Sequence, residues 1–156
     1  MTRPIRDVIV RYLNKREGTI KAIKDRELMQ AIIDNTPKDI KRIREQMYNL
    51  LSPQLTGMPS AHEPKSGEEK LVNNLTDVEM LCDRYDRAIA YMDWFMPAWE
   101  ALSKDEQFIL VTFYVGPRYQ LPAVDQVSRV FHIERSTAYN RKNQALDKLS
   151  VLLFGS

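Results

Sequence analysis

A regular stripe of apolar side chains runs through the middle of the chain. Its members alternate at spacings of four and three residues: Leu71, Leu75, Val78, Cys82, Tyr85, Ile89, Met92, Met96 and Trp99. Such a heptad seam is typical of a helix that packs against another helix along its length. We therefore expect a long helix that opens at a capping box, Ser66 to Glu69, and bends or ends near Pro97.

Two partners could cover this seam. One is a preceding helix that starts at Pro37 after an N-cap Thr36 and carries a stripe of its own, Ile40, Ile43, Met47 and Leu50. The other is a second copy of the chain. We expect the first partner for part of the seam and favour a dimer for the remainder, because short helices leave part of so long a stripe uncovered.

The pattern ahead of Thr36 is also helical. Helices are expected over residues 5–15 and 20–33 with an interruption at Gly18, and a linker rich in proline is expected over about 52–65. The whole sequence has only five glycines and no run in which apolar and polar residues alternate. It therefore predicts an all-α protein.

Three further helices are expected after the seam. A second capping box, Ser103 to Glu106, opens the first of them. Pro122 starts the next helix, which ends at Phe131, and residues 132–134 make a tight turn into the last one.

The last helix has two chemically distinct sides. At about 100° per residue, its inner side centres on Ala138 and holds Ala145, Leu149 and Leu152. Its outer side carries Ser136, Asn140 and Asn143. These are mediocre helix formers at positions where an ordinary surface helix carries glutamate and lysine. Because amide and hydroxyl groups suit base edges and phosphates, this side predicts double-stranded DNA as the ligand.

The formal net charge of +2 hides an uneven distribution. Residues 1–59 hold 12 Lys and Arg against 7 Asp and Glu, residues 60–106 hold 5 against 11, and residues 107–156 hold 6 against 3. Basic ends favour phosphate, and an acidic middle is a poor DNA surface. For the N-terminal excess, the coating of solvated helix faces is an equally good explanation.

Residue types that carry enzymatic or metal chemistry are scarce. His62, His132 and Cys82 match neither a nucleophile with its base nor a zinc spacing, so we expect no enzyme, no cofactor and no metal. A solvated acidic face is expected from Glu79, Asp83 and Asp86. Neither a signal peptide nor a membrane-spanning run is found, and we expect a cytoplasmic protein without a membrane partner.

The C-terminal order of motifs resembles region four of bacterial sigma factors. The motifs are Ser103-x-Asp105-Glu106, a helix ending Val130-Phe131, a turn, Arg135-Ser136-Thr137-x-Tyr139, and Ala145-Leu146-x-x-Leu149. With the stretch 55–60 and the long middle helix, residues 50–155 look like small phage transcriptional regulators of the ArpU/RinA type. The resemblance implies a helix-turn-helix that binds specific DNA in the control of phage genes, with contact to host RNA polymerase as a further option.

The resemblance also assigns site residues. Four positions match the exposed first turns that a recognition helix inserts into the major groove: Arg135, Ser136, Tyr139 and Asn140. Asn143 lies one turn further along, and Thr137 of the same motif is also expected to bind DNA. Phosphate contact is expected from Arg141, Lys142 and Lys148. The sequence departs from the family pattern at His132, where glycine is frequent, and at Glu134, where a serine or threonine cap is expected.

The sequence thus predicts two modules. Residues 1–101 form a helical, partly coiled-coil oligomerisation module, and residues 102–156 form the DNA-binding helix-turn-helix module. The predicted function is sequence-specific transcriptional regulation. Two alternatives stay open: a phage DNA-packaging protein similar to a terminase small subunit, and a sigma-like protein that binds RNA polymerase but not DNA on its own.

Overall fold

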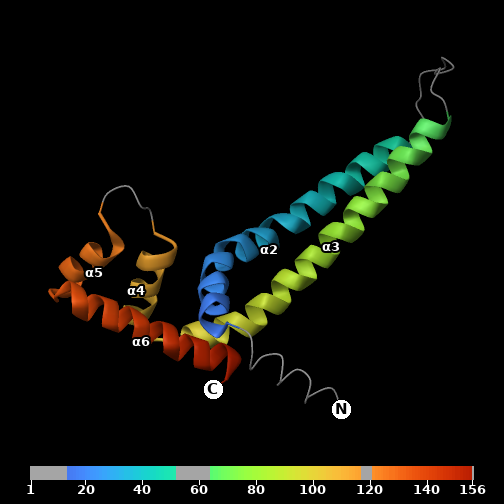
Figure 1. Ribbon diagram of the computed structural model, residues 1–156. Coiled ribbons are helices and arrows are strands. Elements are labelled where there is room, and N and C mark those ends of the chain that lie inside the picture. Colours follow the sequence, from blue (N-terminus) through green and yellow to red (C-terminus); the bar gives the residue numbers. More distant parts are fainter. Residues whose placement is uncertain (1–13, 52–63, 117–120, 156) are drawn as a thin grey trace, which may run out of the picture. The chain divides into compact units, whose positions relative to one another are not determined.

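The computed structural model describes residues 14–51, 64–116 and 121–155, apart from the side chains of 64–66, and within these ranges it contains helices and no strand (Figure 1). The helices are α2 (Lys15–Leu51), α3 (Pro64–Glu100), α4 (Lys104–Tyr114), α5 (Ala123–Phe131) and α6 (Arg135–Phe154). The all-α prediction is confirmed. Most of the helix expected over 5–15, most of the linker expected over 52–65, and His62 lie outside the described residues.

Helix α2 is longer than the sequence predicts. The interruption at Gly18 and the separate start at Pro37 are both wrong, because both residues lie inside one helix of 37 residues. Gly18 lies against the ring of Phe154, whose Cζ atom would be 3.2 Å from a Cβ placed on the glycine. Thr36 is only 3% exposed and sits within the helix rather than capping it. Packing therefore overrides the local stop and start signals in α2.

The start of α3 also differs from the expected one. The helix begins at Pro64, so Ser66 lies inside its first turn and the predicted capping box is wrong. Proline is well suited to the first helical position, since its missing N–H would have no partner there. At the other end, α3 stops at Glu100, three residues after Pro97, which agrees with the predicted end.

The buried side of α3 contains most of the predicted seam. Seven of the nine seam residues are buried or half-buried, and five of these recur at heptad spacing: Leu71, Val78, Tyr85, Met92 and Trp99. The residues between them on the same side are Asn74, Leu81, Ala88 and Phe95. The seam residues Leu75, 49% exposed, and Cys82 are exposed, so the prediction is wrong for these two, whereas Ile89 and Met96 are half-buried. Because Asn74 and Ala88 are not strongly apolar, the hydrophobic pattern of the sequence does not show that they lie on the buried side of α3.

The described residues group into two compact units, and α2 and α3 contribute to both. One unit contains residues up to Leu28 and from Met92 onward, and the other contains Met29–Tyr91. The second unit is a helical pair made of the remainder of α2 and α3 (Figure 1). The division into separate modules over residues 1–101 and 102–156 stays a prediction.

The first unit holds α4, α5 and α6 around a shared core. Buried residues from all three helices form this cluster, Ile109, Val124, Val127 and Ala138, with Phe113, Phe131 and Ile133 packed against it. The capping box at the start of α4 is confirmed, because Ser103 and Glu106 exchange two hydrogen bonds of 3.2 Å between side chain and backbone. This box fixes the point at which the chain enters α4.

The inner side of α6 is confirmed at Ala138, Ala145 and Leu149, all of which are buried. The prediction for Leu152 is wrong, since it is 45% exposed and Leu153 is buried in its place. The buried positions from Ala145 onward are thus four residues apart, at Ala145, Leu149 and Leu153. In a straight helix the buried side drifts in this way relative to a seven-residue repeat.

A turn of three residues joins α5 to α6, as the sequence predicts. His132 adopts the left-handed conformation, with φ 54° and ψ 49°, and the N–H of Ile133 donates to the carbonyl of Ser128 at 3.1 Å. Glu134 occupies the N-cap of α6, but its side chain makes no cap hydrogen bond. The turn thus places His132 in a conformation that glycine adopts freely, and Glu134 at the N-cap without a side-chain cap.

The backbone of His132 generates a prediction about stability. A left-handed conformation costs an L-residue about 1 to 2 kcal/mol, whereas glycine adopts it freely. We expect His132→Gly to be about 1 kcal/mol more stable than His132→Ala in chemical denaturation, since the alanine variant isolates the backbone effect from loss of the imidazole. A glycine variant less stable than the alanine variant would contradict the left-handed assignment.

The register of α3 generates a second prediction. Ala88 is fully buried and Ala90 is exposed on the same helix. Ala88→Asp buries an unpaired carboxylate and should lower the free energy of unfolding by about 3 kcal/mol or more, whereas Ala90→Asp should change it little. Urea denaturation followed by circular dichroism measures both. Equal effects of the two substitutions would show that the buried side is not the one described.

Candidate nucleic-acid interface

The outer side of α6 presents polar side chains to solvent. Ser136 and Asn140 are exposed on the side of the helix opposite the fully buried Ala138. Within the described parts of the chain, neither side chain makes a hydrogen bond or ion pair to another residue. Their donors and acceptors are therefore available to a ligand. Thr137, next to them, is half-buried.

Asn143, the third residue of this outer side, has a partner that the sequence did not predict. The Nη2 atom of Arg16 in α2 donates a hydrogen bond of 3.0 Å to its Oδ1 atom. Arg16 also acts on the phenol of Tyr114 in α4 through its charge and a hydrogen bond. A cation from the start of α2 thus lies beside α6. The only signal for it in the sequence was the basic excess of residues 1–59.

Lys142 lies among aromatic rings. Its Nζ atom is 5.2 Å from the ring centroid of Phe113 and 5.4 Å from that of Tyr139. Burial, followed by the nearby charge of Arg16, lowers the pKa of the Lys142 amine. Contact between Lys142 and a phosphate stays a prediction, and it requires the amine to move away from these two rings.

Tyr139 combines two roles. Its ring is 5.9 Å from that of Phe113, which ties it to the core of the unit, yet the residue is 44% exposed. Packing therefore fixes the ring while its hydroxyl can remain accessible. Nothing in this arrangement prevents the predicted contact with DNA.

The remaining cationic residues of the predicted site are held by neighbouring side chains. Arg135 pairs with Asp125 at 3.1 Å, and Lys148 pairs with Glu106 at 3.1 Å. Arg141 lies over the ring of Phe131 at 5.6 Å. All three residues are exposed, so such contacts are weak and can be exchanged for phosphates.

Glu106 connects the predicted interface to the fold. Burial by itself raises the pKa of this carboxyl, but hydrogen bonds from Ser103 and Lys148 outweigh it and leave the pKa below its usual value. The carboxylate thus has two uses, capping α4 and holding Lys148. If Lys148 leaves Glu106 to bind a phosphate, the hydrogen bonds between Glu106 and Ser103 that cap α4 remain.

The outer side of α6 offers groups that can form hydrogen bonds with a ligand. No group of three or more His, Cys, Asp or Glu side chains that could hold a metal ion occurs among the described residues. No described helix is long and apolar enough to cross a bilayer. On α6, hydroxyl, amide and guanidinium groups gather over the first turns, and Asp147 follows further along the helix. A carboxylate there repels phosphates, which limits the usable length of the helix.

Comparison with known proteins identifies no relative. No protein-family model, no curated protein and no solved structure matches the chain. The resemblance to sigma region four and to phage regulators therefore stays a prediction from the motifs.

The contact between Arg16 and Tyr114 can be tested by titration. Burial raises the pKa of the Tyr114 phenol, and Arg16 partly offsets this by stabilising the phenolate. Arg16→Gln removes that offset, so Tyr114 should ionise at a higher pH than in the parent protein. Carbon-13 NMR of labelled tyrosine, with Tyr114→Phe for assignment, measures the midpoint. Arg26→Gln, which removes a cation over Trp99, is the matched control. An unchanged midpoint in Arg16→Gln would remove Arg16 from this site.

Proposed function

We propose that the protein binds double-stranded DNA sequence-specifically through the outer side of α6 and regulates transcription. The observation that carries this proposal is the exposure of Ser136 and Asn140, unpaired within the described residues, on a helix whose other side is fixed in the core. Such side chains lower helix propensity without contributing to packing, and they are suited to base edges. Arg16 supports the proposal because it adds positive charge beside the same helix.

The residues divide into two classes of contact. Asn140 can form a bidentate pair with adenine in the major groove, and Ser136 can bond to several bases or to a phosphate. Arg135, Arg141 and Lys148 contact phosphates, after exchange of their present partners. Asn143 and Arg16 act together, since a hydrogen bond joins them. Base contacts then give specificity, and phosphate contacts give most of the affinity.

The biological setting of the proposal comes from the resemblance to phage regulators. That resemblance implies control of phage genes, with contact to host RNA polymerase as an option. The cytoplasmic location and the dimer are proposed on separate grounds, the lack of a recognisable signal peptide or membrane-spanning run and the length of the seam. A dimer would present two copies of α6, as paired half-sites require.

Asn140→Ala tests the reading role of α6. The substitution removes an amide that can make two bonds to a base, so binding to the preferred duplex should weaken by about 1 to 3 kcal/mol, with little change on a scrambled duplex. The preferred duplex is obtained by selection from a random pool. Asn73→Ala, an exposed asparagine on the acidic α3, is the matched control and should bind both duplexes like the parent.

A salt series separates this proposal from its rivals. If the parent protein shows no salt-dependent binding to any duplex, the DNA proposal is wrong and a protein that binds only RNA polymerase becomes the better explanation. A ring larger than a dimer that binds DNA would favour the packaging function.

A further inference from the structure

The helical pair within Met29–Tyr91 has a second, outward-facing stripe on each helix. On α2 the stripe follows spacings of four and three and is exposed throughout: Pro37, Lys41, Arg44, Tyr48 and Leu51. On α3 it follows the same spacings and is also exposed: Glu68, Val72, Leu75, Glu79, Cys82 and Asp86. These are the spacings that a helix uses to pack against another helix.

Both stripes lie on the same side of the helical pair. Most stripe residues directly follow one from the inner side: Arg44 follows the half-buried Ile43, and Leu75 follows the half-buried Asn74. One step along a right-handed helix rotates the side chain by about 100°. When two antiparallel helices pack against each other, the residues that directly follow their contact residues all lie on the same side of the pair. We call the two stripes together the hairpin face.

The hairpin face combines exposed apolar residues with charges whose sign differs between its two stripes. Its large apolar members are strongly exposed: Tyr48 at 72%, Leu51 at 68%, Val72 at 60% and Leu75 at 49%. Its α2 stripe carries positive charge at Lys41 and Arg44, and its α3 stripe carries negative charge at Glu68, Glu79 and Asp86. Apolar residues exposed as a group, with charges of opposite sign on either half, are typical of an interaction surface.

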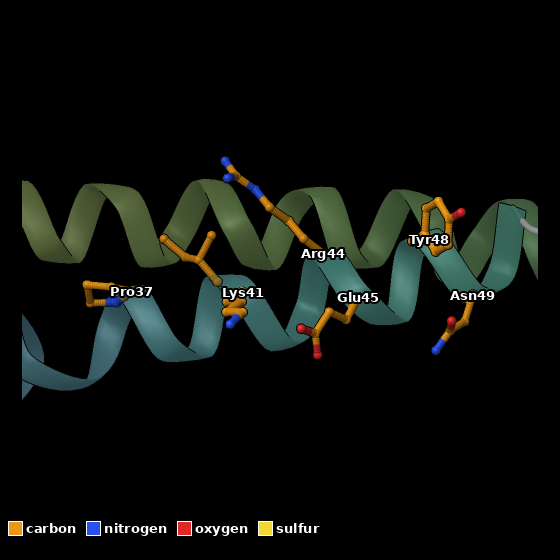
Figure 2. Close-up of a pocket in the computed structure, with 7 residues that line it drawn as sticks. Pro37, Lys41, Arg44, Glu45, Tyr48 and Asn49 are labelled. Carbon is orange, nitrogen blue, oxygen red and sulfur yellow. The ribbon is translucent and has the colours of Figure 1, made fainter.

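A shallow groove follows the α2 stripe. It has a volume of about 560 Å³ and includes Pro37, Ile40, Arg44 and Tyr48 in its lining. Figure 2 shows Arg44 and Tyr48 rising from one side of α2, while Glu45 and Asn49 point to the other side. The groove is thus open toward the hairpin face, where another helix can lie in it.

We propose that the hairpin face binds a second copy of this chain. When two copies are related by a two-fold axis parallel to their helices, the α2 stripe of each copy lies over the α3 stripe of the other. Lys41 and Arg44 then meet the partner's acidic stripe twice in one dimer. The same contact covers the exposed apolar members of both stripes. The charge pattern argues against the other two-fold arrangement, in which α2 lies on α2 and like charges meet.

This inference deepens the dimer of the proposed function but does not depend on DNA binding, because it is tested without DNA. Sedimentation equilibrium of the full chain should give twice the 18.2 kDa mass of one copy. Lys41→Glu with Arg44→Glu makes both stripes acidic, and Glu68→Lys with Glu79→Lys gives the α3 stripe a net positive charge, with Asp86 as its remaining acid. Each double variant alone should dissociate about tenfold more readily or worse, through like-charge contacts.

Mixing the two double variants distinguishes contacts between copies from contacts within one copy. The acidic hairpin face of one variant complements the net positive face of the other, so the mixture should recover the mass of a dimer. Lys38→Glu with Arg42→Glu is the matched control, since these two residues are exposed on α2 outside the stripe. Circular dichroism should show equal helicity in all variants. Any of three results would overturn the proposal. The parent chain could sediment as a monomer, the double variants could dimerise like the parent, or the mixture could stay monomeric.

Discussion

One side of α6 is buried in the core, and this burial determines which residues of the helix face outward. Ala138, Ala145 and Leu149 are buried, and they fix the rotation of the helix about its axis. The outward direction of Ser136 and Asn140 follows from this rotation and not from any contact of their own. A helix held in this way presents its polar groups without an entropic cost for orienting the backbone when a ligand binds.

The start of α2 extends the same site by a contact that is distant in the sequence. Arg16 and Asn143 are 127 residues apart and share a hydrogen bond of 3.0 Å. The aromatic residues of α3 and α6 hold this end of the unit together, since the Trp94 indole N–H donates to the carbonyl of Leu153 and its ring contacts Phe154 edge-on. Phe154 in turn lies against Gly18, one turn or less from Arg16. The position of the guanidinium therefore depends on packing at the far end of α6.

Sequence reasoning recovered the elements whose signals are local. The capping box at Ser103, the turn at His132 and the inner residues Ala138 and Ala145 all follow from short-range patterns, and the structure confirms them. It failed where packing decides. Thr36 and Pro37 carry the signature of a helix start, yet tertiary contacts keep α2 continuous through them. The buried side of α3 includes Ala88 and Asn74, which no hydrophobic pattern emphasises. For the same reason, neither the partner of Asn143 nor the rings beside Lys142 could be predicted, because both are set by three-dimensional packing.

The central claim is that the outer side of α6 contacts DNA, and amide NMR tests it most directly. A nitrogen-15-labelled protein would be titrated with a duplex selected from a random pool, at a salt concentration that suppresses non-specific binding. The account predicts that the largest shifts fall on Ser136 to Asn143 and on Arg16, with the buried positions of α6 less affected. Shifts confined to other helices, or saturation of binding without change along α6, would contradict it.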